Sequence, residues 1–145
     1  KWLLEKATEI GLSRITPVIC QRSERKVLRP DRLQKVLLAA MKQSLKARLP
    51  VLDEAIKLKD CLKAPGFTGK KYIAHCAEGV RVSLRENYSP GSDVMVLIGP
   101  EGDFTPEELA LAQAQGWQPL GLGPSRLRTE TAALVACTMI YQLNI

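Results

Sequence analysis

Two stretches in the second half of the chain combine glycine-bracketed turns with charged side chains. Val94–Glu108 contains the turn Gly99-Pro100-Glu101-Gly102, and Leu120–Ala132 contains Gly121-Leu122-Gly123 followed by Arg128-Thr129-Glu130. Such turns present backbone donors and acceptors to the polar edges of a small ligand, because glycine permits close approach. One stretch alone could be a tight turn and nothing more. Two of them in one short chain favour a shared ligand site.

Apolar side chains that could enclose a flat ring lie beside both turns. They are Ile98, Leu120, Leu122 and Leu127. Two nucleotide-binding motifs are excluded. The glycines at 121 and 123 lie too near the C-terminus, and are followed too soon by Pro124, for the dinucleotide fingerprint. The phosphate-loop pattern GxxxxGK[ST] does not occur in the chain.

The first turn must be positioned by a strand before it and a helix after it. Val94–Ile98 is a continuous apolar run, typical of a strand buried on both faces of a parallel sheet. Thr105, Pro106 and Glu108 predict a helix start with a capping box. Because open α/β sheets bind ligands at the carboxyl ends of their strands, the site is expected at that edge.

The rest of the chain alternates predicted strands and helices, which favours an α/β fold with a mostly parallel sheet flanked by helices. The predicted strands are Ile15–Cys20, Val51–Leu52, Tyr72–Cys76, Val80–Leu84, Val94–Ile98 and Pro119–Gly123. The predicted helices run from Lys1 to Gly11, from Asp31 to Pro50, from an Asp53 cap to Lys63, from Thr105 to Gly116 and from Thr129 to Leu143. No internal repeat or linker interrupts this order.

The predicted last helix is apolar almost all round. A sheet can cover one face of such a helix, and another face then needs a different partner. A homodimer interface formed by Ala132 to Leu143 is the natural candidate.

Length and composition indicate one globular domain. With 145 residues the chain can bury a sizeable core, and no apolar run is long enough for a signal peptide or a membrane span. We therefore expect a cytoplasmic protein without a membrane partner. The four cysteines show no CxxC pairing and His75 is the only histidine, so no zinc site is predicted. The cysteines are expected to be small buried side chains in a reducing compartment.

The positive charge is concentrated in one segment. The chain carries a net charge of +6, and Gln21–Pro50 holds nine basic residues against two acidic ones. This excess favours a polyanionic partner such as nucleic acid. A solvated basic face explains the charge equally well.

These motifs resemble those of a known family. LIGPEGDFTPEE followed by LGLGPSRLRTETAAL resembles the C-terminal signature of the bacterial 16S rRNA uridine N3-methyltransferases, within the SPOUT superfamily. Upstream, LLEKATEIGLSRITPV resembles the family's opening helix and strand, and QRSER its basic loop. The segment from Leu38 to Pro50 resembles its second helix. The resemblance covers essentially the whole chain in the family's order.

The resemblance implies a fold and a cofactor. It implies a C-terminal trefoil knot, S-adenosylmethionine held by the knot loops, a homodimer, and residues 1–145 as the catalytic domain. Family members usually carry an N-terminal PUA-like β-barrel that helps to bind RNA. From the abrupt start at Lys1, we expect that domain to be absent from residues 1–145. The implied cofactor-binding residues are Leu97, Ile98, Gly99, Gly102, Leu120, Leu122, Gly123, Ser125, Leu127 and Arg128.

The implied reaction is transfer of a methyl group to N3 of a uridine in 16S rRNA of the small ribosomal subunit. N3 of uracil carries a proton, so the base must be unpaired and the proton must leave. Arg128 is the candidate for electrostatic support, and Glu130 or Glu101 for accepting the proton or orienting the base. Glu130 could equally be a first-turn residue favoured by the helix dipole.

Phosphate contacts are assigned to the basic segment. The candidates for gripping RNA are Arg22, Arg25, Lys46 and Arg48. The alternative function is a non-catalytic RNA-binding or ribosome-assembly module with a methyltransferase-like fold. That alternative explains the basic segment but gives no reason for both glycine-bracketed turns.

Two positions depart from the family pattern. Asp103 stands where glycine is usual after GPEG, and Lys46 stands where arginine is usual after Gln-Ser. The first departure affects the loop expected to face the cofactor. The second removes the planar fork with which arginine grips phosphate.

Overall fold

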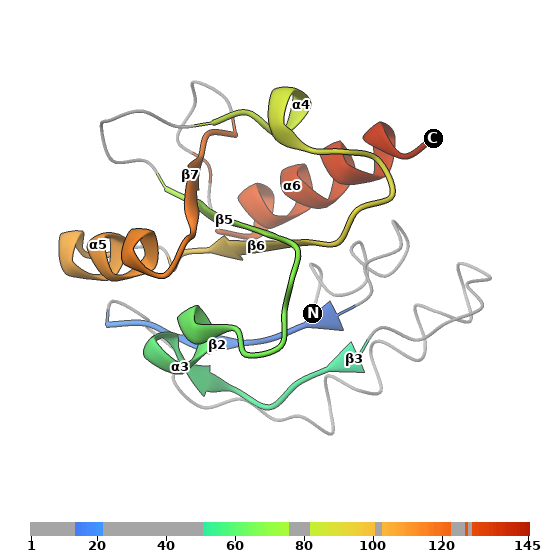
Figure 1. The fold of residues 1–145 in the computed structure, drawn as a ribbon. Coiled ribbons are helices and arrows are strands. Elements are labelled where there is room, and N and C mark those ends of the chain that lie inside the picture. The colour runs from blue at the N-terminus through green and yellow to red at the C-terminus, as the bar shows by residue number, and fades with distance from the viewer. Residues whose placement is uncertain (1–13, 22–50, 76–81, 101–102, 123–126, 128) are drawn as a thin grey trace.

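The computed structural model describes residues 14–21, 51–75, 82–100, 103–122, 127 and 129–145 (Figure 1). Its elements in chain order are β1 (Arg14–Ile15), β2 (Val18–Ile19), β3 (Val51–Leu52), β4 (Ile56–Lys57), α3 (Leu58–Lys63), β5 (Lys70–Ala74), α4 (Leu84–Asn87), β6 (Val94–Ile98), α5 (Pro106–Ala114), β7 (Gln118–Leu120) and α6 (Thr129–Leu143). The alternation of strands and helices confirms the predicted α/β class.

The strands form parallel pairs throughout the described part of the chain. A three-stranded sheet has the order β6-β5-β7, so β5 lies in the middle. Two shorter parallel pairs, β1 with β3 and β2 with β4, complete the pairing. The prediction of a mostly parallel sheet is therefore confirmed.

Side chains from both faces of the three-stranded sheet are covered. Along β5, Ile73 packs into one apolar cluster, and its neighbours Tyr72 and Ala74 pack into another. The first cluster includes residues of α3 and α5, and the second includes residues of α4 and α6. In Figure 1, α4 and α6 accordingly lie on one side of the sheet and α3 on the other. This two-sided burial explains why β6, Val94–Ile98, is a continuous apolar run.

The late elements follow their local sequence signals. Thr105 is the N-cap of α5, Pro106 is its first residue, and the predicted capping box with Glu108 is present. The turn after α5 contains Gly116 at φ +91°, a conformation that glycine adopts without strain. β6 and α6 have the predicted bounds.

One predicted strand is divided in two. Ile15–Cys20 was expected to be continuous, but β1 and β2 are separated at Thr16-Pro17 and pair with different strands. Pro17 has no N–H group to donate, although its carbonyl oxygen accepts a hydrogen bond from Ile56 N at 3.1 Å. Pro17 therefore interrupts the strand, and the two parts pair with different partners.

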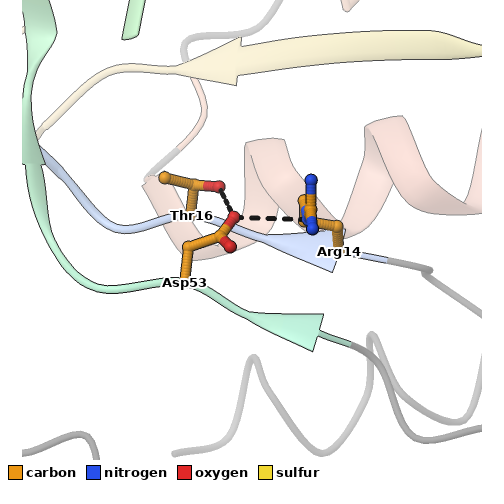
Figure 2. Close-up of polar contacts among 3 residues, drawn as sticks. All are labelled: Arg14, Thr16 and Asp53. Carbon is orange, nitrogen blue, oxygen red and sulfur yellow. Dashed lines mark hydrogen bonds and ion pairs between the residues drawn. The ribbon is translucent and has the colours of Figure 1, made fainter. Parts of the chain in front are cut away.

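Asp53 does not cap a helix, contrary to the prediction. Its carboxylate accepts a hydrogen bond from Thr16 Oγ1 at 2.5 Å and pairs with Arg14 Nε at 3.4 Å (Figure 2). Its backbone N–H donates to the carbonyl of Ile15 at 2.9 Å. Asp53 thus joins the segments of β1 and β3, and α3 starts only at Leu58.

Two further strand predictions are corrected. The strand predicted at Tyr72–Cys76 runs instead from Lys70 to Ala74, because its ladder begins where Lys70 pairs with Val94. The strand predicted at Pro119–Gly123 is β7, which ends at Leu120 when its pairing with β5 ends.

The predicted strand Val80–Leu84 is wrong at its C-terminal end. Leu84 begins α4, with Ser83 as the N-cap residue, and Val82 makes only an isolated bridge to Leu120. The buried Leu84 side chain belongs to the cluster shared by α4 and α6, so helix packing overrides the alternating pattern. The helices predicted before Gly11 and between Asp31 and Pro50 lie outside the described residues.

Candidate functional site

The sheet register brings the two glycine-bracketed turns to one edge. Ala74, the last residue of β5, pairs with Ile98 of β6 on one side and with Leu120 of β7 on the other. The turns that begin at Gly99 and Gly121 therefore leave the same edge on either side of β5. The predicted juxtaposition of the two stretches is confirmed.

The first turn is packed tightly against the core. Gly99 is buried, and a Cβ atom on it would lie 3.0 Å from the ring of Phe104. Phe104 is itself buried in the first apolar cluster. The backbone N–H of Asp103 donates to Pro100 O at 2.8 Å and closes the turn. A side chain at position 99 would thus crowd this aromatic ring.

Asp103 adopts a backbone conformation that glycine favours. This explains why glycine is the usual residue at this position in the family that the sequence resembles. Its φ is +63°, in the left-handed region that glycine favours and that aspartate tolerates better than most residues. Its Oδ1 atom accepts a hydrogen bond from Phe104 N at 2.8 Å, which supports the turn locally. Asp103 therefore adopts the same left-handed backbone conformation that glycine would adopt at this position.

The capping box of α5 also reaches the start of the basic segment. Glu108 Oε1 accepts from Thr105 N at 2.8 Å, and Thr105 Oγ1 accepts from Glu108 N at 3.1 Å. The other carboxylate oxygen of Glu108 accepts from Gln21 N at 3.1 Å. One side chain therefore holds both the helix after the first turn and the residue at which the basic segment begins.

The second turn is held by residues distant in the sequence. Val82 N donates to Pro119 O at 2.8 Å, and Gly121 N donates to Val82 O at 2.9 Å. Leu122 is half-buried against the second apolar cluster. The backbone on both sides of Leu120 is thereby tied to the segment before α4.

A side-chain hydrogen bond connects the two stretches directly. The hydroxyl of Thr129, at the start of α6, donates to the carbonyl oxygen of Gly99 at 2.8 Å. This bond joins the residue after β6 to the first residue of the last helix. The two motifs identified in the sequence are therefore in contact and not only at the same edge.

The predicted cofactor residues differ in what they offer at this edge. Ile98 and Leu122 are half-buried, and so is Leu127. Leu97 and Leu120 are only 6% and 0% exposed and pack into the first and second clusters. Their side chains pack in the core, which leaves only their backbone groups to face a ligand.

The charged candidates fall largely outside the described residues. Glu130 belongs to the first turn of α6. The candidates outside the described residues are Glu101, Gly102, Gly123, Ser125, Arg128, Arg22, Arg25, Lys46 and Arg48.

His75 is a site candidate that the sequence analysis did not assign. It follows β5 directly and is only 9% exposed. Because Ala74 pairs with both Ile98 and Leu120, the next residue lies between the turns that start at Gly99 and Gly121. The sequence carries no local signal for it, because its place depends on the register of the three strands.

The described residues do not form a metal cluster, since no three His, Cys, Asp or Glu side chains among them gather as ligands. Cys20 is buried, and Cys61 and Cys137 are half-buried free thiols. Burial raises the pKa of the Cys61 and Cys137 thiols, which favours their neutral form. Within the described part of the chain, no helix is both long and apolar enough to cross a membrane.

Comparison with protein families identifies the class of domain. A model described as an RNA methyltransferase domain matches residues 1–141. The chain therefore belongs to the RNA methyltransferase domain family.

Individual relatives agree with this family. The ribosomal RNA small subunit methyltransferase E of Rickettsia conorii is 30% identical over 142 residues, which cover 97% of this chain and 58% of that protein. The crystal structure of a probable rRNA-methyltransferase from Porphyromonas gingivalis is 41% identical, with a TM-score of 0.92 over 99% of this chain and 61% of that one.

A third relative was solved with a ligand. The structure of a ribosomal RNA small subunit methyltransferase E from Neisseria gonorrhoeae bound to S-adenosyl methionine is 30% identical, with a TM-score of 0.85. The match covers 99% of this chain and 60% of that one. The chain thus spans less than two thirds of the length of each of these relatives.

Proposed function

We propose that this domain catalyses transfer of a methyl group from S-adenosylmethionine to N3 of a uridine in 16S rRNA of the small ribosomal subunit. The observation that carries the proposal is the contact between the two motif-bearing stretches, Val94–Glu108 and Leu120–Ala132, made by Thr129 and Gly99. It lies in a member of the RNA methyltransferase domain family. The Rickettsia relative is named as a small subunit methyltransferase, and the Neisseria relative holds S-adenosyl methionine.

The described residues suit a ligand of this kind. Ile98 and Leu122 are half-buried apolar side chains beside backbone turns that begin one residue beyond the ladder. Apolar side chains next to backbone polar groups match a flat heteroaromatic ring with polar edges. We assign the adenosine part of the cofactor to this edge, with Gly102, Gly123, Ser125 and Leu127 completing the loops. When bound, the cofactor supplies an activated methyl group on a sulfonium.

In this reaction the protein positions the uracil base and assists removal of its N3 proton. N3 of uracil lies on the pairing edge, so the uridine must be unpaired before it is reached. We assign Arg128 to stabilising the negative charge left on the ring when the N3 proton departs. Glu130 or Glu101 accepts that proton or orients the base.

The RNA is held by the basic segment. We assign phosphate contacts to Arg22, Arg25, Lys46 and Arg48, in the segment that carries most of the positive charge. Charge reversal at Arg22 and Arg25 is expected to weaken RNA binding and to flatten its dependence on salt, because fewer counterions are released. Binding of labelled RNA measured across a salt series tests this role, and an unchanged slope would contradict it.

We further propose a homodimer and a knotted C-terminus. Within α6, Ala136 is buried, whereas the surrounding apolar residues are half-buried and Tyr141 is 47% exposed. A second copy packed on Ala132 to Leu143 would cover this surface. The knot is supported by the return of α6 from β7 to the end of β6, where Thr129 contacts Gly99. Sedimentation of the purified protein tests the dimer, and a monomer at micromolar concentration would contradict it.

We place the reaction in the cytoplasm, on ribosomal subunits, and propose that a PUA-like domain precedes this one in the whole protein. The longer relatives support such a further segment, because this chain covers only 58% of the Rickettsia protein. The full-length protein is therefore the proper sample for activity measurements.

Two measurements test the function in sequence. Calorimetry with S-adenosylmethionine is expected to show one binding site per chain. Absence of binding by a folded sample would favour the alternative, a non-catalytic RNA-binding or ribosome-assembly module. Mass analysis of nucleosides after incubation with small ribosomal subunits is then expected to reveal N3-methyluridine. A methyl group on ribose or on another base would contradict the assigned product.

A further inference from the structure

We propose that Thr129 is a positioning residue that fixes the first cofactor-facing turn against the start of α6. The inference rests on the proposed function, because it concerns how tightly the same edge holds its cofactor. It assigns the effect to one hydroxyl group that does not need to touch the ligand.

The Thr129 hydroxyl donates its hydrogen bond to a residue outside its own helix. Its Oγ1 atom donates to Gly99 O at 2.8 Å, thirty residues earlier in the chain. Thr138 of the same helix makes a hydrogen bond of the same length, but to Leu134 O one turn earlier in α6. Of these two hydrogen bonds, the one made by Thr129 constrains a segment outside α6, and the one made by Thr138 does not.

The acceptor of this bond lies where the sheet stops supporting the chain. The parallel ladder of β5 and β6 ends at the pair of Ala74 and Ile98, one residue before Gly99. A carbonyl group in this buried position needs a partner, and the hydroxyl of Thr129 provides it. Without the hydroxyl, the first residue of the turn would lose its link to α6.

Both sides of Gly99 are then defined. On one side the ring of Phe104 lies 3.0 Å from the place that a Cβ atom of Gly99 would take. On the other side Thr129 is part of a helix anchored by Met139, Ile140 and Leu143, which pack against the second apolar cluster. The turn is thus held between a core aromatic ring and the first residue of a packed helix. A shift of either holder would move the first turn.

The test replaces the hydroxyl while keeping the shape of the side chain. Thr129→Val is isosteric but cannot donate, Thr129→Ser keeps the donor, and Thr138→Val removes the matched bond inside α6. Binding of S-adenosylhomocysteine is measured by calorimetry for each full-length variant. Thr129→Val is expected to raise Kd about 3- to 10-fold with an unchanged number of sites, as befits the loss of one hydrogen bond. Thr129→Ser is expected to restore most of the affinity, and Thr138→Val to leave Kd unchanged.

The number of sites separates positioning from a merely structural role. A structural role would lower the folded fraction, and therefore the number of sites, without changing Kd. That result, or equal Kd values for wild type and Thr129→Val, would overturn the inference. Failure of the wild-type protein to bind S-adenosylhomocysteine would instead contradict the proposed function, so the two failures are distinguishable.

Discussion

The two turns at the candidate ligand edge are held in different ways. The first is closed mainly by bonds within a few residues, from Asp103 N to Pro100 O and between Thr105 and Glu108, with Thr129 as its distant partner. The second depends on distant partners, because Gly121 bonds to Val82. A locally built turn keeps its shape from its own sequence, whereas a turn held by distant bonds moves when its partners move. Changes in the first turn should therefore lower stability, and changes in the second should mainly lower affinity.

The largest effect is expected from Phe104→Ala. The ring is 3% exposed, belongs to the first apolar cluster and supports Gly99. Its removal should lower the free energy of unfolding by about 3–5 kcal/mol, since it leaves a cavity in the core. Urea denaturation measures this loss. Leu111→Ala on the exposed side of α5, where the side chain is 38% exposed, is the control and should cost less than about 1 kcal/mol. Similar losses for both variants would refute the anchoring role of Phe104.

A smaller effect is expected at Asp103. Asp103→Ala puts an alanine at φ +63° and removes the acceptor for Phe104 N, so it should cost about 2 kcal/mol. Asp103→Asn keeps a side-chain oxygen and tolerates the left-handed conformation, and it should stay within about 0.5 kcal/mol of wild type. Thermal and urea unfolding of the three proteins provide the comparison. If alanine is as stable as asparagine, the backbone conformation does not select the residue at this position.

The smallest effect on stability is expected in the second turn, at Leu122. The side chain is half-buried against the second cluster, so Leu122→Ala should cost only about 1 kcal/mol. Its loss should nevertheless raise the Kd for S-adenosylmethionine about 3- to 10-fold, because an apolar wall of the assigned adenosine site is removed. Leu122→Met, which conserves volume, is the control. A large loss of stability with unchanged affinity would reverse the contrast between the two turns.

Elements whose signals are local were predicted well. The start of α5 followed from the order of threonine, proline and glutamate, because each satisfies a backbone group within one turn of the helix. β6 was predicted from its run of five apolar residues. The run is apolar throughout because apolar clusters cover both faces of the strand.

The errors have a shared physical cause. Asp53 carried a helix-capping signal, but Thr16 and Arg14 of the neighbouring segment bind its carboxylate instead. Leu84 carried a strand pattern, but packing among α4 and α6 placed it in a helix. In both cases a contact with a distant residue outweighed a local preference.

The candidate site shows the same division. Ile98, Gly99 and Leu122 could be named from motifs, because glycine-bracketed turns after apolar strands are visible in the sequence. His75 could not, since its relevance depends on the register that places Ala74 between Ile98 and Leu120. A lone histidine at a strand end carries no such information by itself.

The sequence by itself determined the cap of α5 and the extents of β6 and α6, because these depend on the local order and polarity of the residues. Tertiary structure alone decided that β7 lies across β5 from β6, and that the Thr129 hydroxyl meets the carbonyl of Gly99. The reason is that parallel pairing and hydrogen bonds between distant residues form only where the packed core brings the segments together.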